Sequence, residues 1–262
     1  MDPSLRTAAS GMAAQQTRID VIANNLANVN TPGFKRSRAH FEDLLYQTVQ
    51  GQQISGSLDV GTIPEIQIGR GTRLSSVLRV HDQGTFEMTN RPTDLAINGD
   101  GMFQVRMPDG TIAYTRDGSF TISDEGILVT AGGYPVIPDI QITEELRELA
   151  VSHSGIVTAT VAGQNSSVEI GQIELARFPN EPGLKALGEN LWAETAASGQ
   201  PMLGSPQEIG FGRIDQGFLE SSNVEVVQEM VDMIAALRAY EINAKAVQAS
   251  EDMADITNQM AR

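Results

Sequence analysis

Apolar and small side chains recur at alternating spacings of three and four residues near the start of the chain. They are Leu5, Ala8, Met12, Ile19, Ile22, Leu26 and Val29, and only Gln15 interrupts the series. A straight helix repeats every 3.6 residues, so a repeat of about 3.5 keeps one narrow seam facing a partner helix. Pro32 and Gly33 end the pattern. We therefore predict a helix about 37 Å long whose partner is not its neighbour in sequence.

A second long helix is predicted at the other end of the chain, because Val224 to Met260 contains neither Gly nor Pro. One apolar stripe consists of Val226, Met230, Met233, Leu237, Tyr240, Ala244 and Val247. A second stripe consists of Ile242, Ala246, Ala249, Met253, Ile256 and Met260. Ser222 or Asn223 can cap the first turn. Two stripes on different faces indicate more than one packing partner.

The middle of the chain, from Leu74 to about Leu203, alternates short apolar runs with turn signals. The turns are Gly99-Asp100-Gly101, Pro108-Asp109-Gly110, Asp117-Gly118, Asp124-Glu125-Gly126 and Gly132-Gly133. This pattern is typical of antiparallel hairpins, and we expect type I′ turns at the Asp-Gly pairs. The evenly spaced aspartates also suggest metal ligands. Calcium loops need several oxygen ligands within one short segment, so structural turns are favoured.

These elements predict an α+β fold. An all-β middle domain, a small barrel or sandwich of short antiparallel strands, is flanked by long coiled-coil-type helices that pack together. The expected divisions are an N-terminal helix at 1–33, an extended linker or arm at 34–73, the middle domain at 74–203, a return linker at 204–222 and the C-terminal helix at 223–262.

The charge of the chain restricts its partners. The sequence has 18 Lys and Arg against 33 Asp and Glu, a net charge of −15, which disfavours nucleic acid and anionic membranes. Lys35, Arg36 and Arg38 form one local basic cluster, too short to reverse this balance. The first residues lack the basic and apolar regions of a signal peptide, and no window approaches the ~18 apolar residues of a membrane-spanning helix. Read alone, these features indicate a cytoplasmic protein.

No arrangement of residues predicts catalysis. There is no cysteine, so disulfides and thiol chemistry are excluded. His40, His81 and His153 are isolated, and neither a phosphate loop nor a Gly-x-Ser-x-Gly elbow is present. We therefore expect no enzyme activity, no catalytic or metal-binding residues and no cofactor. A different class, an oligomeric cell-wall polysaccharide-binding β module, would need clustered aromatic side chains, and the single Trp and four Tyr are spread along the chain.

The segment from Ala23 to Lys35 resembles the N-terminal signature of the bacterial flagellar rod and hook proteins. The residues that carry this resemblance are Asn24, Asn25, Asn28, Thr31, Pro32, Gly33 and Phe34. The segment from Arg91 to Phe103 is similar to the family's "TDLAI-G-GFF" motif, with Met102 in place of the first aromatic residue. Tyr114–Phe120, Leu128–Tyr134 and Gly188–Thr195 also resemble family segments.

The resemblance implies a structural subunit of a helical homopolymer in the basal body. Terminal helices of such proteins pack around a central export channel and form a rigid hollow drive shaft that transmits torque. Implied partners are other copies, other rod proteins, the hook protein and the surrounding rings, with no nucleic acid and no membrane insertion. The implied location is the periplasm, reached by flagellar type III export without a cleaved signal peptide.

Length and the segment Arg238–Lys245 favour the distal rod branch of the family over the proximal rod and hook branches. Tyr46–Gly71, where the chain departs from the hook pattern, is a candidate arm that stiffens the polymer. The resemblance and the seams together assign subunit packing to a defined set of side chains. They are Leu5, Met12, Ile19, Ile22, Leu26, Val29, Met230, Met233, Leu237, Tyr240, Val247, Met253 and Ile256.

Overall fold

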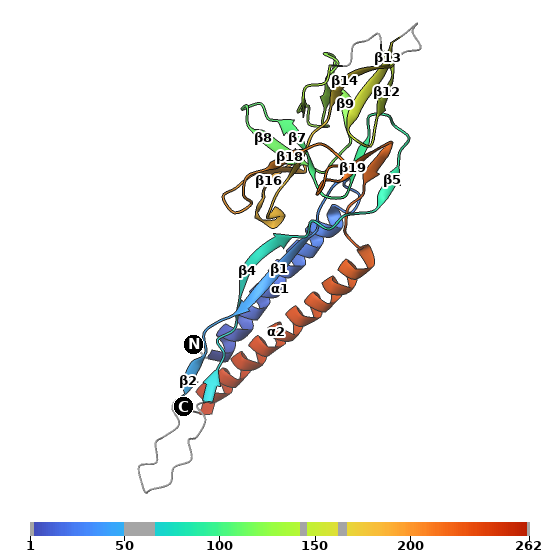
Figure 1. Cartoon of the computed structure of the whole chain (residues 1–262). Helices are drawn as coiled ribbons and strands as arrows, with labels where there is room; N and C mark the ends of the chain where they lie inside the picture. The colour runs from blue at the N-terminus through green and yellow to red at the C-terminus, as the bar shows by residue number, and fades with distance from the viewer. Residues whose placement is uncertain (1–2, 50–65, 142–145, 162–166, 261–262) are drawn as a thin grey trace. The chain divides into compact units, whose positions relative to one another are not determined.

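The computed structural model describes residues 3–49, 66–141, 146–161 and 167–260 (Figure 1). The chain forms two compact units. The helical unit comprises Met1–Leu26, Ser37–Leu78 and Val226–Arg262, and the strand unit comprises Ala27–Arg36 and Arg79–Glu225. Each unit therefore draws on segments that are far apart in sequence.

Two helices dominate the helical unit, α1 (Pro3–Ala27) and α2 (Val226–Met260). Arg18 Nη2 lies 3.0 Å from Asp232 Oδ1, and Asn25 Nδ2 donates to Glu229 Oε2 at 3.2 Å. Because these pairs advance in opposite sequence directions, the helices run antiparallel (Figure 1). Neither helix, within the residues described, is long and apolar enough to cross a lipid bilayer.

Four strands complete the described part of the helical unit. Strand β1 (Ser37–Asp43) pairs with β4 (Thr72–Arg79), and β2 (Gln47–Val49) pairs antiparallel with β3 (Ile66–Ile68). The described residues of this region form strands and the loops that connect them. The start of β4 is tied to α1, because Ser10 Oγ accepts a hydrogen bond from the backbone N–H of Thr72 at 3.3 Å.

The strand unit contains one large sheet and several small ones, and its pairings within the described residues are antiparallel, as predicted. The large sheet has the order β16-β17-β8-β7-β15-β18, with β11 also on β7. Its strands are β7 (Met102–Arg106), β8 (Ile112–Thr115), β11 (Val136–Ile137), β15 (Leu175–Arg177), β16 (Lys185–Gly188), β17 (Leu191–Ala193) and β18 (Met202–Gly204).

The smaller sheets are formed by strands that come before, between and after those of the large sheet in the sequence. They are formed by β12 (Leu146–Val151), β13 (Ile156–Val161) and β14 (Ser167–Gln172); by β5 (Phe86–Met88) and β20 (Phe218–Glu220); by β6 (Leu95–Asn98) and β19 (Arg213–Gln216); and by β9 (Thr121–Ile122) and β10 (Leu128–Val129). A single 3₁₀ turn, η1 (Glu181–Gly183), is found within the described residues.

The large sheet buries side chains on both faces. Along β7, Phe103 and Val105 belong to the main core, whereas Met102 belongs to a second, smaller cluster with Tyr114 and Trp192. This division follows from the two-residue period of a strand, which sends successive side chains to opposite faces. Continuous apolar runs in the sequence therefore mark central strands of this sheet.

The expectation of type I′ turns was wrong. The carbonyl groups of Met107, Ser123, Thr130 and Ser152 each accept a hydrogen bond from a Gly N–H three residues later. Those glycines, Gly110, Gly126, Gly133 and Gly155, have φ between +76° and +83°, and the residues before them do not have positive φ. A type I′ turn needs positive φ at both central residues, so these are type I turns followed by a left-handed glycine.

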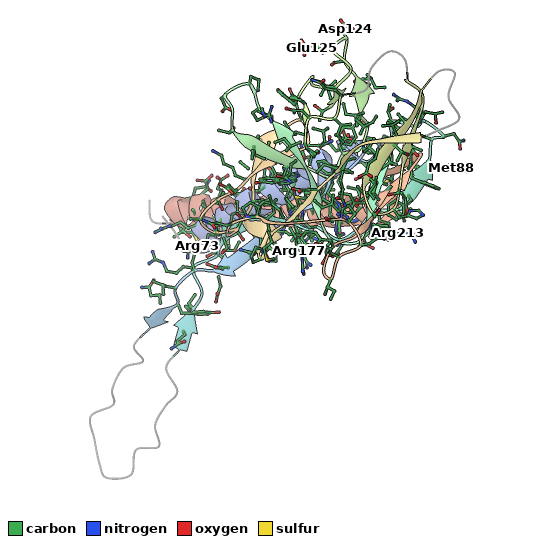
Figure 2. All side chains as sticks on the ribbon, turned by 45° about the horizontal axis from the view of Figure 1, so that its top comes forward. Arg73, Met88, Asp124, Glu125, Arg177 and Arg213 are labelled. Atoms are coloured by element: carbon green, nitrogen blue, oxygen red, sulfur yellow. The ribbon has the colours of Figure 1, made fainter. Side chains whose placement is uncertain are left out.

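Acidic side chains in the turns have structural partners. Asp109 Oδ1 accepts hydrogen bonds from the backbone and hydroxyl of Thr111, and Asp117 Oδ1 accepts the same pair from Ser119. These are Asx turns, in which the side chain replaces a backbone acceptor. Figure 2 shows Asp124 and Glu125 at the tip of the β9–β10 turn. The described residues contain no cluster of three or more metal-ligating side chains.

Candidate assembly site: the signature loop and its clamp

The signature segment leaves α1 at Ala27 and forms a loop, which we call the signature loop (residues 28–36). The hydroxyl of Thr31 donates to Asn28 Oδ1 at 3.2 Å, and the backbone N–H of Thr31 donates to the Asn28 carbonyl at 3.2 Å. Phe34 N–H then donates to the Thr31 carbonyl at 3.2 Å. Asn28 and Thr31 therefore shape the turn that follows the helix, which explains their place in the signature.

Gly33 is required at its position by both its conformation and its surroundings. Its φ is +67°, and its N–H donates to the Glu220 carbonyl at 2.8 Å. A Cβ on Gly33 would lie 2.6 Å from the backbone nitrogen of Asp117, which is closer than real Cβ contacts come. The preceding Pro32 carbonyl accepts a hydrogen bond from Asn190 Nδ2 at 3.0 Å. The loop backbone is thus fixed against three separate parts of the strand unit.

Lys35 enters a buried ion triad. Its Nζ lies 2.6 Å from Glu220 Oε1, and Arg116 Nε lies 2.9 Å from Glu220 Oε2. The side chains of Lys35, Arg116 and Glu220 are only 1%, 7% and 1% exposed. Gly84 N–H also donates to Glu220 Oε1 at 2.9 Å. The sequence showed Lys35 only as part of a local basic cluster, and the structure buries its ammonium group inside the protein.

Burial lowers the pKa of Lys35, and the Glu220 carboxylate opposes this effect. Lys35 Nζ also donates to the Asp82 carbonyl at 2.8 Å, so its charge has a second oxygen partner. The Glu220 carboxylate is thus the ion-pair partner of two buried cations, Lys35 and Arg116. We call Lys35, Arg116 and Glu220 the buried triad.

Aromatic rings pack beside the triad. Phe34 is buried, and the guanidinium of Arg79 lies 5.7 Å from its ring centroid and 4.7 Å from that of Trp192. His81 meets Trp192 edge to face, with the ring centroids 5.2 Å apart. Burial, reinforced by the charges of Lys35, Arg116 and Arg79, lowers the pKa of His81 to about 4. The imidazole is therefore neutral at pH 7.

Asn223 fastens the signature loop from the other end of the sequence. Its Oδ1 accepts from Arg36 N–H at 2.8 Å, and its Nδ2 donates to the carbonyls of Val80 and Asp82 at 2.8 and 2.9 Å. Asn223 therefore does not cap α2. The hydroxyl of Ser222 accepts from Val224 N–H at 3.3 Å, but Val224 lies before α2, which begins at Val226, so this bond does not cap the helix either. We call the buried triad together with Asn223 the clamp.

Asn25 plays a comparable part within the helical unit. Its Oδ1 accepts from Ser37 N–H at 2.8 Å, and its Nδ2 donates to the Ser37 carbonyl at 2.9 Å as well as to Glu229. The side-chain amide of Asn25 thus pairs with the backbone N–H and C=O of Ser37, the first residue of β1, as a neighbouring strand would. This role explains why a poor helix-forming residue is buried within α1.

The predicted packing residues differ in how far the single chain covers them. On α1, Ile22 is buried, and Leu5, Met12, Ile19 and Leu26 are half-buried; Val29, in the signature loop, is also half-buried. On α2, Met233 and Val247 are half-buried, whereas Met230, Leu237, Tyr240, Met253 and Ile256 are exposed. The α2 residues buried in the single chain are instead Glu229, Ala236 and Ser250. The apolar stripes of α2 therefore remain largely uncovered.

The sequence reasoning missed the clamp, apart from the signature residues that reach it. Arg116, Glu220 and Asn223 are far apart in the chain, and no local pattern distinguishes a buried charge from an exposed one. The Arg116-Asp117-Gly118 segment was recognised only as a turn with a family resemblance. Arg116, directly before the Asp117-Gly118 turn, is the residue that could have indicated a buried acidic partner.

Three family models match the chain. They describe the flagella basal body rod protein (residues 5–35), the flagellar hook protein FlgE/F/G D1 domain (residues 96–159) and the flagellar basal body rod FlgEFG protein C-terminal region (residues 215–260). The first contains most of the signature loop, the second contains Arg116, and the third contains Glu220 and Asn223. Each part of the clamp thus lies in a matched region.

Full-length relatives give the same result. The flagellar basal-body rod protein FlgG of Borreliella burgdorferi is 49% identical over 99% of this chain and 98% of its own length. FlgG of Caulobacter vibrioides is 47% identical over 98% of each chain. FlgG of Bacillus subtilis is 38% identical over 95% of this chain and 96% of its own. The chain belongs to the family of flagellar basal-body rod proteins.

Proposed function

We propose that the chain is a structural subunit of the flagellar distal rod and polymerises through its terminal helices into a rigid hollow shaft. In this proposal the shaft carries the export channel and contacts other rod proteins, the hook protein and the surrounding rings. The subunit reaches the periplasm by flagellar type III export. Because the family is structural, the chain is not an enzyme.

The uncovered surface of α2 is the observation that carries the proposal. Nine large apolar side chains of α2 are between 44% and 84% exposed: Val227, Met230, Val231, Ile234, Leu237, Ile242, Met253, Ile256 and Met260. A helix of a monomeric globular protein normally buries its apolar face. Burying the exposed half of one such side chain contributes about 1 kcal/mol, so nine give several kcal/mol towards assembly.

Neighbouring copies supply the missing partners in this proposal. Their helices pack against α1 and α2 with the seven-residue repeat of a coiled coil, using the predicted packing residues. The strand unit, which we propose to close as a small barrel or sandwich, folds without them. It contains the main buried core and the clamp, both of which lie within a single chain.

Leu237→Glu tests the assignment. Leu237 is 44% exposed, so the soluble subunit tolerates glutamate, whereas burial of an unpaired carboxylate in the polymer costs several kcal/mol. We expect Leu237→Glu to abolish sedimentable polymer and motility while leaving the circular dichroism of the subunit unchanged. Ile122→Glu is the matched control, because Ile122 is 46% exposed but lies on β9. Equal assembly of both variants contradicts polymerisation through α2.

We also propose that Tyr46–Gly71 forms an arm that stiffens the polymer by bridging axial neighbours. The segment Gln50–Gly61 lies outside the described residues, and β2 and β3 pair on either side of it. Exposed Leu45, Tyr46 and Ile68 give these flanks apolar side chains for a neighbouring copy. Deleting Gln50–Gly61 is expected to leave polymerisation intact and to give bent rods in electron micrographs. Straight rods, or no rods, would remove the segment from this role.

A further inference from the structure

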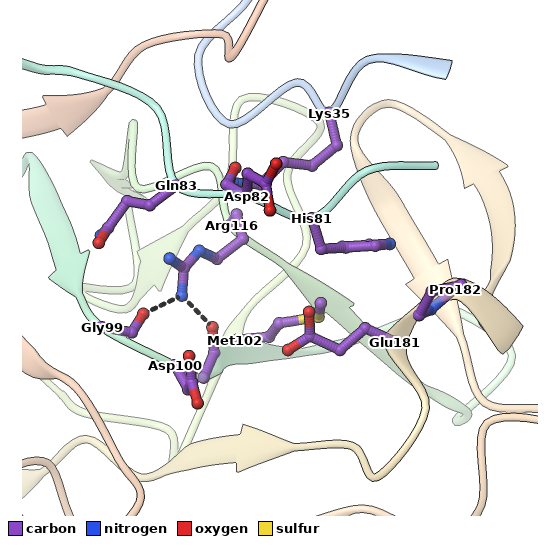
Figure 3. A pocket seen from close by; sticks show the side chains of 11 residues that line it. Lys35, His81, Asp82, Gln83, Gly99, Asp100, Met102, Arg116, Glu181 and Pro182 are labelled. Atoms are coloured by element: carbon purple, nitrogen blue, oxygen red, sulfur yellow. Dashed lines mark hydrogen bonds between the residues drawn. The ribbon is translucent and has the colours of Figure 1, made fainter. Parts of the chain in front are cut away.

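A pocket of about 410 Å³ lies beside the buried triad, within the strand unit (Figure 3). Its floor includes the buried residues Lys35, Met102 and Arg116. Exposed residues line its rim, namely Asp82, Gln83, Asp100 and Pro182. Gly99 and Gly101 also line the pocket. The volume is sufficient for one long side chain from another molecule.

The cations on the floor are already engaged. Arg116 uses Nε on Glu220 and Nη1 on the carbonyls of Gly99 and Gly101 (Figure 3). Lys35 uses its ammonium on Glu220 and on the Asp82 carbonyl. An anion that approached Lys35 Nζ or Arg116 Nε would therefore compete with Glu220 for those donors.

The carboxylates of the wall and rim are not engaged to the same extent. Glu181 is half-buried in the pocket wall and forms no ion pair or hydrogen bond through its side chain with any described residue. Burial, with a contribution from Asp100, raises the pKa of Glu181, and the nearby cations only partly offset this. Asp82 likewise has no ion-pair partner in the described part of the chain, whereas Asp100 lies 3.4 Å from Arg177. A half-buried carboxylate without a counterion is costly, and an incoming cation would remove that cost.

We propose that this pocket binds the guanidinium or ammonium side chain of a second copy of the chain, held by Glu181. The inference rests on the proposed function, since it is the polymer that brings a second copy to the pocket. The neutral ring of His81 and the side chain of Met102 offer apolar contacts to the methylene stem of the incoming side chain. The charged group of that side chain then lies beside Glu181 and Asp82. Exposed cations that form no ion pair with other described residues include Lys185 on β16 and Arg238 on α2.

Trp192 provides an optical report on the pocket, because it is the only tryptophan and it touches His81, which lines the wall. The soluble subunit is titrated with N-acetylarginine amide at constant ionic strength, with N-acetylglutamine amide as the uncharged probe. We expect a saturable change of Trp192 fluorescence with the arginine probe only. Glu181→Gln should weaken it roughly 10-fold or more, the value of one charge-assisted hydrogen bond.

Glu125→Gln is the matched control, because Glu125 is an exposed carboxylate of the same unit that does not line the pocket. It should leave the titration unchanged. No saturation with the wild-type subunit, or equal saturation with Glu181→Gln, overturns the inference.

An assembly assay distinguishes failure of this inference from failure of the proposed function. At high concentration, wild-type subunits should sediment as rods, and Glu181→Gln should need roughly 10-fold more protein to do so. Glu181→Lys should fail, and a partner reversal such as Lys185→Glu or Arg238→Glu should restore assembly if it supplies the occupant. Equal assembly of wild type and Glu181→Gln rejects the pocket and leaves the rod function standing. Failure of the wild-type chain to form any polymer rejects the rod function itself.

Discussion

Replacing one member of the buried triad should cost very different amounts of stability depending on which charge is removed. Glu220 accepts hydrogen bonds from Lys35 Nζ at 2.6 Å, Arg116 Nε at 2.9 Å and Gly84 N–H at 2.9 Å. Glu220→Gln keeps the shape of the side chain but leaves two buried cations without an anion. Breaking a buried ion pair in this way costs ~3–5 kcal/mol.

Lys35→Met should cost much less. It leaves Arg116 paired with Glu220 and makes the triad neutral, and methionine fills most of the space of the lysine stem. The variant loses the bond to the Asp82 carbonyl but no longer has to bury an ammonium group, whose desolvation already lowers the pKa of Lys35. We expect a net change within about 1 kcal/mol, because a broken pair is costly when it leaves an uncompensated buried charge, and Glu220 remains paired with Arg116 in this variant.

Thermal unfolding of the soluble subunit, followed by Trp192 fluorescence, measures both variants. For a domain of 150–250 residues, each kcal/mol shifts Tm by ~2–4 °C, so Glu220→Gln should lower Tm by ~6–20 °C and Lys35→Met by less than ~4 °C. The double variant should recover part of the Glu220→Gln loss, since one stranded cation is gone. Glu125→Gln, on an exposed turn, serves as the control. Equal losses for Glu220→Gln and Lys35→Met would refute the reasoning from charge balance.

Three further predictions concern the same two units. Gly33→Ala should lower the free energy of unfolding of the strand unit, measured by urea denaturation, by ~2 kcal/mol or more, because it combines a φ of +67° with a backbone overlap. Gly110→Ala, at φ +83° with open space around it, should cost only ~1–2 kcal/mol. Lowering the pH from about 6.5 to about 4 should destabilise the strand unit by up to ~3 kcal/mol through His81, because the unfolded chain binds the proton at higher pH than the folded one. His81→Phe should remove this dependence of the free energy of unfolding on pH, as measured by equilibrium unfolding curves. Asn25→Ala should leave Ser37 without its side-chain partners and speed amide exchange at Ser37 by at least ~10-fold; unchanged exchange there would contradict the bridging role of Asn25.

The elements with a strong local period could be predicted from the sequence. Both long helices follow from the three-and-four spacing of apolar residues, which only Gln15 interrupts in the first helix, and the antiparallel middle follows from short apolar runs between glycine turns. The turn type was mispredicted because Asp-Gly is compatible with two geometries. In Met107–Thr111 the aspartate stays at negative φ and accepts hydrogen bonds from Thr111, so only Gly110 is left-handed. The choice depends on a side-chain acceptor that the dipeptide alone does not specify.

The clamp could be predicted only in part. The residues Thr31, Pro32 and Gly33 stand out because they end a helix. The hydrogen-bond partners of Pro32 and Gly33, however, are Asn190 and Glu220, which are far away in the chain. The charge pattern predicted no environment for Lys35, because it showed only that Lys35, Arg36 and Arg38 are basic neighbours in the sequence. Whether a lysine is buried depends on a carboxylate arriving from another segment, and in this chain that carboxylate is Glu220. Such long-range pairing leaves no periodic trace in a single sequence.

The position of the clamp gives the signature a mechanical reason. The signature loop follows α1 and the segment Glu220–Asn223 precedes α2, and in the strand unit these two segments bond directly to each other. Gly33 N–H donates to the Glu220 carbonyl at 2.8 Å, and the side chain of Asn223 accepts from Arg36 N–H at 2.8 Å. Force that reaches the strand unit through either helix therefore meets the same set of bonds. In the proposed function this junction holds the strand unit by both connections, whereas a strand unit held by one helix alone would twist about a single connection. The signature residues are, on this argument, the part of the family sequence that keeps both connections fastened together.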